Sequence, residues 1–95
     1  MDPDAVRLVD RFMPDGRLQR MPRKGAKRQV VLEHIAHLFE PGVRYTERQV
    51  DAVLRGVCEG GESDHVTLRR YLVDAQLLGR DAGEYWRVGG WVDGT

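Results

Sequence analysis

Three histidines and one cysteine are the side chains in this sequence with the widest range of chemistry. His34 and His37 are three residues apart, so on a helix both could face one metal ion, with His65 or Cys58 as a further ligand. Structural zinc sites need four such ligands and catalytic sites three, each supported by further hydrogen bonds. The simpler interpretation of His37 is a half-exposed residue beside Leu38. We therefore predict no metal ion and no other cofactor.

Covalent catalysis has little support in the sequence. Cys58 follows Val57 at the end of a predicted helix, where a small buried side chain is more common than an activated thiolate. The single serine, Ser63, is explained as a helix cap. The sequence contains no nucleophile elbow, phosphate-binding loop or dinucleotide-binding glycine motif. We predict that the protein is not an enzyme.

Positive charge is concentrated in one segment. Residues 16–30 contain no Asp or Glu and hold six cations, namely Arg17, Arg20, Arg23, Lys24, Lys27 and Arg28. The whole chain has fifteen Lys or Arg and fifteen Asp or Glu, so the other residues hold nine cations and fifteen anions. A basic segment on a neutral protein can still attract an anionic polymer, because the field acts over a Debye length of about 8–10 Å. The alternative is that these cations only form a solvated surface.

Length and composition limit the broad class. The chain has 95 residues, which suits one domain, and a hydrophobic share of 41%, which suits a packed core. A mean hydropathy of −0.51 and the absence of an apolar run of about 18 residues predict no membrane association. Asp2 and Asp4 stand where a secretory signal would be apolar, and a single cysteine suits a reducing compartment. We expect a cytoplasmic protein.

Four helices follow from apolar spacing, capping residues and turns. The segments are 3–13 with Asp2 as cap, 25–39, 46–58 with a Thr46–Gln49 capping box, and about 64–77 with Ser63 or Asp64 as cap and Gly79 as stop. Short strands are predicted at 43–45, 78–81 and 84–88, the last two joined as a hairpin across Ala82–Gly83.

This order of elements is that of a winged helix. We predict a mainly α (α+β) winged helix-turn-helix with a three-helix core, a short β-hairpin wing and an additional N-terminal helix. The predicted divisions are an N-terminal helix and basic arm at 1–19, the winged-helix-like domain at 20–88, and a frayed tail at 89–95.

Winged helices commonly insert the helix before the hairpin into the major groove of DNA. Here that is the helix at about 64–77, which assigns base-facing roles to His65, Thr67, Arg69 and Arg70. Phosphate contacts are expected from Arg80 in the wing and from Arg23, Lys24, Lys27 and Arg28. The competing interpretation of Arg70 is an ion pair with Asp74, four residues further along the helix.

Double-stranded DNA is thus the first partner hypothesis, and the protein would be a transcriptional regulator. The alternative is a protein-interaction or dimerisation module that makes no DNA contact and binds itself or a partner regulator through exposed apolar groups such as Val66, Val73 and Trp91. Glu59, Glu62 and Asp64 precede the fourth helix and would repel phosphates if they face DNA.

Several separate blocks of the sequence resemble a known family. They are Arg20–Lys24, Lys27–Ala36, Phe39–Glu47, Asp64–Asp74 and Tyr85–Val88. In this order they are similar to the prokaryotic domain-of-unknown-function family 2087, whose members occur alone or fused to helix-turn-helix transcriptional regulators. The resemblance implies a setting in transcription regulation and no defined activity. The stretch from Cys58 to Ser63 is longer than the turn usual in that family.

Overall fold

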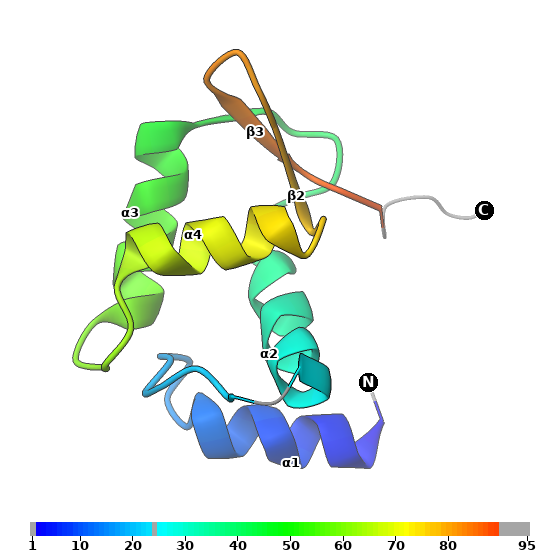
Figure 1. Ribbon diagram of the computed structural model, residues 1–95, viewed down its shortest axis with the longest axis vertical. Helices are drawn as coiled ribbons and strands as arrows, with labels where there is room; N and C mark the ends of the chain where they lie inside the picture. Colours follow the sequence, from blue (N-terminus) through cyan, green and yellow to red (C-terminus); the bar gives the residue numbers. More distant parts are fainter. Residues whose placement is uncertain (1, 24, 90–95) are drawn as a thin grey trace.

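A computed structural model of the protein describes residues 2–23 and 25–89. Its elements, in chain order, are α1 (Pro3–Phe12), α2 (Gly25–Ala36), β1 (Tyr45–Thr46), α3 (Glu47–Cys58), α4 (His65–Asp74), β2 (Leu78–Asp81) and β3 (Glu84–Arg87). In Figure 1, α4 crosses between α3 and α2, with the hairpin at one end of the molecule and α1 at the other. The predicted winged-helix-like α+β fold is confirmed.

The sheet is antiparallel, with strand order β1-β3-β2. Tyr85 on β3 lies opposite Tyr45 on one side and Arg80 on the other, so it occupies the centre of the sheet. Ala82 and Gly83 both have positive φ, at 51° and 79°, which matches the twist of a tight two-residue hairpin. The predicted hairpin across these residues is therefore confirmed.

Side-chain caps explain where three helices begin. Asp2 accepts a hydrogen bond from the Ala5 N–H at the start of α1. Thr46 and Gln49 form a reciprocal capping box at α3, with distances of 3.1 and 2.9 Å. Asp64 accepts a hydrogen bond of 2.9 Å from the Thr67 N–H at α4. The sequence predicted all three, and Asp64 rather than Ser63 is the cap of α4.

The end of α4 differs from the prediction. The helix ends at Asp74 and not near Leu77, because Gln76 adopts a left-handed conformation with φ of 61°. The N–H groups of Gln76 and Leu77 donate to the carbonyls of Val73 and Leu72, which is the Schellman pattern of a helix C-terminus. Gly79 is not the stop. It lies in β2 directly under the Trp86 ring, which would lie 2.2 Å from a Cβ at that position.

The two remaining boundaries shift only slightly. The α2 helix ends at Ala36, and residues 37–39 continue it as a tighter turn with hydrogen bonds to the third residue back. The strand predicted at 43–45 is found at Tyr45–Thr46. Its Tyr45 packs edge-on against Phe39, and its hydroxyl accepts a hydrogen bond of 2.7 Å from the Glu40 N–H.

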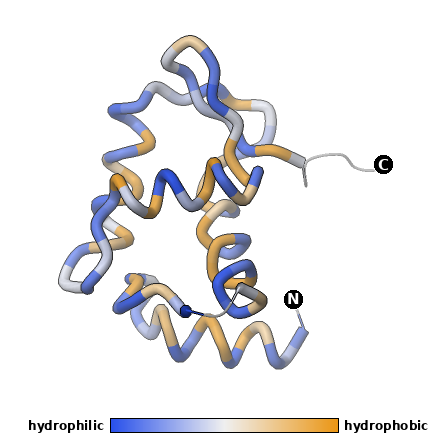
Figure 2. The backbone as a smooth tube through the Cα atoms, in the orientation of Figure 1, coloured by the Kyte–Doolittle hydropathy of each residue, from blue (hydrophilic) through white to orange (hydrophobic). Residues whose placement is uncertain are grey.

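One hydrophobic core spans all four helices and the sheet. Figure 2 shows how hydrophobic positions alternate with hydrophilic ones along each helix. Val9, Phe12 and Leu18 are buried in the same cluster as Leu54, Leu68 and other residues of the winged helix. Apolar residues on both sides of the predicted boundary at 19/20 thus pack together. The predicted tail lies, apart from Gly89, outside the described residues, and within them no helix is long and apolar enough to cross a bilayer.

The loop between α3 and α4 packs against the segment that follows α1. The Glu62 N–H donates to the Gln19 carbonyl at 2.8 Å, and the Leu18 N–H donates to the Val57 carbonyl at 2.7 Å. Between these two bonds, a Cβ at Gly61 would lie 2.1 Å from the Leu18 carbonyl oxygen. The long turn therefore docks on the basic arm while α3 and α4 remain packed against each other.

Substituting two glycines tests this packing. Gly61→Ala should lower the free energy of unfolding by about 1–3 kcal/mol, since backbone must move to admit the methyl group. Gly56→Ala is the control, because Gly56 lies within α3 with open space around it. That change should raise the free energy of unfolding by about 0.5–1 kcal/mol. Urea unfolding measures both, and equal effects of the two variants would contradict the docking of the loop.

Candidate functional site

The groove between α4 and the hairpin is the surface where a winged helix would meet DNA. It has a volume of about 190 Å³ and is lined by Val66, Arg69, Arg70, Val73, Asp74, Arg80 and Tyr85. Arg70 on α4 and Arg80 on β2 are both exposed. The Arg80 guanidinium also lies 5.7 Å from the centre of the Tyr85 ring. The structure therefore brings these two predicted contacts to one concavity.

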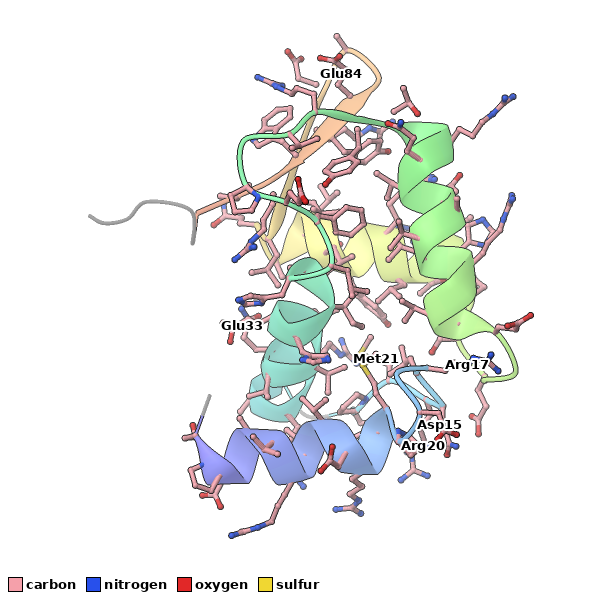
Figure 3. All side chains as sticks on the ribbon, turned by 180° about the vertical axis from the view of Figure 1, so that it is seen from behind. Asp15, Arg17, Arg20, Met21, Glu33 and Glu84 are labelled. Atoms are coloured by element: carbon pink, nitrogen blue, oxygen red, sulfur yellow. The ribbon has the colours of Figure 1, made fainter. Side chains whose placement is uncertain are left out.

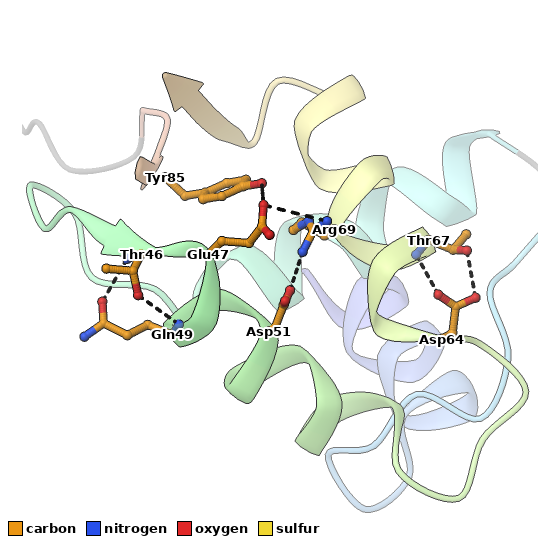
Figure 4. A network of polar contacts seen from close by, with 8 residues as sticks. All are labelled: Thr46, Glu47, Gln49, Asp51, Asp64, Thr67, Arg69 and Tyr85. Carbon is orange, nitrogen blue, oxygen red and sulfur yellow. Dashed lines mark hydrogen bonds and ion pairs between the residues drawn. The ribbon is translucent and has the colours of Figure 1, made fainter. Parts of the chain in front are cut away.

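Arg69 lines the same groove, but its side chain is largely buried and paired. Its guanidinium donates to Asp51 of α3 and lies 3.9 Å from the Glu47 carboxylate (Figure 4). The side chains of Arg69 and Asp51 are each only 17% exposed. Burial lowers the pKa of Arg69, but the hydrogen bond to Asp51 and the nearby negative charges outweigh it, so the pKa is raised and the charge is permanent. Arg69, predicted to face a base, instead joins α4 to α3.

Tyr85 extends this network into the sheet. Its hydroxyl donates a hydrogen bond of 3.0 Å to Glu47, the carboxylate near Arg69. The side chain is fully buried, and this burial, with the bond to Glu47, raises the pKa of the hydroxyl. A neutral Tyr85 thus remains a donor at physiological pH. The four residues Glu47, Asp51, Arg69 and Tyr85, here called the Arg69 network, connect α3, α4 and β3.

The ion pair between Arg70 and Asp74, predicted as the competing use of Arg70, does not form in the part of the chain that the structure describes. Asp51 is 18 residues from Arg69, beyond the reach of any helical spacing rule. One signal could have suggested the partner. Glu47 and Asp51 are one helical turn apart, so α3 presents two carboxylates on one side. Two neighbouring negative charges favour a cationic partner from another element.

The start of α4 contains the other two predicted base contacts, His65 and Thr67, both half-buried. The Thr67 hydroxyl donates a hydrogen bond of 2.8 Å to Asp64, so it is already used within the cap. Hydrogen bonds from the Thr67 N–H and hydroxyl hold the pKa of the Asp64 carboxyl below its ordinary value. Asp64 therefore stays charged next to the helix end that would approach DNA.

The cations of the basic segment are divided among several roles. Arg23 and Lys27 are exposed and line a separate cleft near α1, and Lys24 lies outside the described residues. The Arg28 guanidinium lies 4.7 Å from the Tyr71 ring centre, and its Nε donates to the Pro22 carbonyl at 3.1 Å. The cleft and the α4–hairpin groove share no lining residue.

The other candidate residues have ordinary surroundings. Cys58 is buried at the end of α3, and burial, followed by the charge of Asp64, raises the pKa of its thiol. Among the described residues, no group of three or more His, Cys, Asp or Glu side chains is placed to hold a metal ion. His37 lies in the turn after α2, where its Nδ1 is 2.6 Å from the Glu33 carbonyl oxygen of that helix.

The fold and this groove define a winged-helix-like domain. A family model described as "Uncharacterized protein conserved in bacteria" (DUF2087) matches residues 17–87, and the chain belongs to that family. The match confirms the resemblance found in the sequence. No curated protein and no solved structure matches the chain.

A double-mutant cycle on Arg69 and Asp51 tests the network. Arg69→Ala and Asp51→Ala should each lower the free energy of unfolding by about 2 kcal/mol, since each leaves a largely buried charge without its partner. The coupling energy should exceed about 1 kcal/mol. The exposed pair Asp4–Arg7 is the control and should couple by less than about 0.5 kcal/mol. Equal coupling in the two pairs would show that Arg69 is not a structural residue.

The lowered pKa of Asp64, the cap of α4, predicts that the stability of the fold depends on pH. Because the pKa of Asp64 is lower in the folded protein than its ordinary value of 3.8, its contribution to stability is present above that value and is lost as the pH falls through the lowered folded pKa. Asp64→Asn keeps a good cap without the titrating group. Urea midpoints measured between neutral pH and strongly acidic pH should therefore fall less steeply in Asp64→Asn. Parallel curves would rule out this linkage.

Proposed function

We propose that this domain binds double-stranded DNA through the groove between α4 and the hairpin, as a transcriptional regulator or as part of one. The observation that supports it is the shared exposure of Arg70 and Arg80 in that groove. One comes from the helix that enters the major groove in winged helices and the other from the wing. An arginine on such a helix suits a bidentate contact to guanine, and one on the wing suits a phosphate.

In this proposal Arg69 is a positioning residue. Its ion pairs connect α4 to α3, and Glu47 connects the same network to the sheet through Tyr85. These contacts keep α4 at a set angle to the hairpin, which fixes the spacing of Arg70 and Arg80. Arg69 itself contributes little to the field at the surface, since its charge is neutralised by Asp51 and Glu47.

Acidic residues near the groove limit how strongly it would bind DNA. Asp74 lines the groove, and Asp81 and Glu84 are exposed on either side of the hairpin turn. We therefore expect few phosphate contacts and a shallow dependence on salt. On DNA of random sequence Arg70 meets a phosphate, as Arg80 does, and two phosphate contacts correspond to a log–log slope of about −2, against about −6 to −9 for proteins with many phosphate contacts.

Fluorescence anisotropy with a short random-sequence duplex tests the proposal. The wild type should bind with a slope of about −2 between about 50 and 200 mM salt, and Arg70→Ala/Arg80→Ala should abolish binding. Arg7→Ala/Arg11→Ala removes the same number of charges from α1, at the far end of the molecule from the hairpin (Figure 1), and should bind as the wild type does. No retention by the wild type, or equal loss in both double variants, would overturn the proposal.

The alternative of a protein-interaction or dimerisation module also has one supporting observation. Val66 is 42% exposed on α4 and lines the same groove as half-buried Val73. Under this alternative, light scattering should show a dimer that Val66→Glu converts to a monomer, while DNA is not retained. Trp91, the third apolar residue predicted for this surface, lies outside the described residues.

A further inference from the structure

A second and larger cleft lies at the other end of the domain. It has a volume of about 620 Å³, within the range of small-molecule sites. It is bounded by the end of α1, residues 20–23, the first turn of α2 and the loop before α4. Its lining residues are Phe12, Arg20, Met21, Pro22, Arg23, Lys27, Glu62 and Ser63. Figure 3 shows Arg20 and Met21 in this region, far from Glu84 on the hairpin.

The charge of the cleft favours an anion. Arg20, Arg23 and Lys27 are exposed cations, and Glu62 is the one carboxylate in the lining. This leaves an excess of two positive charges. None of the three cations forms an ion pair within the described part of the chain. A dianionic group would balance this excess.

The walls of the cleft are held in place by hydrogen bonds. The Glu62 N–H donates to Gln19, and the Arg28 Nε donates to Pro22. Arg28 is also held against Tyr71 of α4. The segment at residues 19–22 is thus attached both to the loop that bears Glu62 and to α2. A preformed cleft of this kind loses little conformational freedom when a ligand binds.

The cleft also has an apolar side. Met21 is half-buried, and Phe12 and Pro22 are buried beneath the surface. The Arg20 guanidinium lies 5.5 Å from the centre of the Phe12 ring, so the cation and the ring meet at the cleft. Apolar lining with a few convergent charged groups is typical of small-molecule sites. An organic group attached to the anion would therefore find a matching surface.

We propose that this cleft binds a small organic dianion, such as a phosphate monoester with a compact apolar group. A small ligand fits better than DNA, because the site is concave and Glu62 lies within it. The inference does not rest on the proposed DNA binding, since the cleft and the α4–hairpin groove share no residue. Glu62 and Ser63 directly precede the Asp64 cap, so an occupant would contact the segment that leads into α4.

Calorimetric titration of the whole chain with phenyl phosphate tests the proposal. Phenyl phosphate combines an aromatic ring with a dianion at neutral pH, and inorganic phosphate lacks the ring. Phenyl phosphate should bind more tightly than inorganic phosphate at matched ionic strength. Lys27→Glu should weaken binding by about tenfold or more, since it removes one charge-assisted contact and adds a repulsion. The same substitution places an anion in the first turn of α2, which favours the helix, so the fold should be kept.

A control variant and a competition with duplex DNA complete the test of phenyl phosphate binding. Arg48→Ala removes an exposed cation from α3, outside the cleft, and should bind phenyl phosphate as the wild type does. Duplex DNA at concentrations above its own dissociation constant should not displace phenyl phosphate. The proposal is overturned if phenyl phosphate does not bind, if Lys27→Glu and Arg48→Ala weaken binding equally, or if duplex DNA competes for the cleft.

Discussion

The pairing of Arg69 with Asp51 and Glu47 is the interaction on which the arrangement of this domain depends. An arginine whose side chain is only 17% exposed must have carboxylate partners, because a largely buried charge without them costs several kcal/mol, on the order of 3–5 for a fully buried pair. The partners lie on α3, and Glu47 also accepts from Tyr85 in the centre of the sheet. One charged group therefore sets the relation of α4, α3 and the hairpin, which apolar packing alone would specify less precisely.

The Arg69 network also shows that the cations of this protein have different roles. The net charge of zero conceals a basic segment, yet the cations are not interchangeable. Arg69 is largely buried and neutralised by its carboxylate partners, Arg28 lies on Tyr71, and Arg17 lies 3.6 Å from Glu59. Two groups of exposed cations line concave surfaces, with Arg70 and Arg80 beside the hairpin and Arg20, Arg23 and Lys27 beside α1. The two places differ in size, since the groove has a volume of about 190 Å³ and the cleft about 620 Å³.

The loop from Glu59 to Ser63 connects these two regions physically. Gly61 allows it to lie against the carbonyl of Leu18, and Glu62 then lines the cleft while Asp64 caps α4. This loop, which is longer than the turn usual in the family, thus forms one wall of the cleft. It also leads directly into α4, the helix next to the groove. The N-terminal helix belongs to the same structure, since Phe12 contributes both to the core and to the cleft.

Caps, apolar spacing and turns act over a few residues, so most helices and strands of this protein could be predicted from its amino-acid sequence. The Thr46–Gln49 box, the Asp64 cap and the Ala82–Gly83 turn are all local and were all predictable. The end of α4 was missed because Gln76 takes the left-handed position that glycine usually fills. Which arginine reaches the surface, by contrast, depends on how the helices pack. Arg69 and Arg70 are adjacent in sequence, but a rotation of about 100° along the helix turns one toward Asp51 and the other toward solvent. Which of the two arginines pairs with Asp51 depends on where α3 packs. Asp51 and Arg69 are 18 positions apart, so no local sequence pattern encodes their contact.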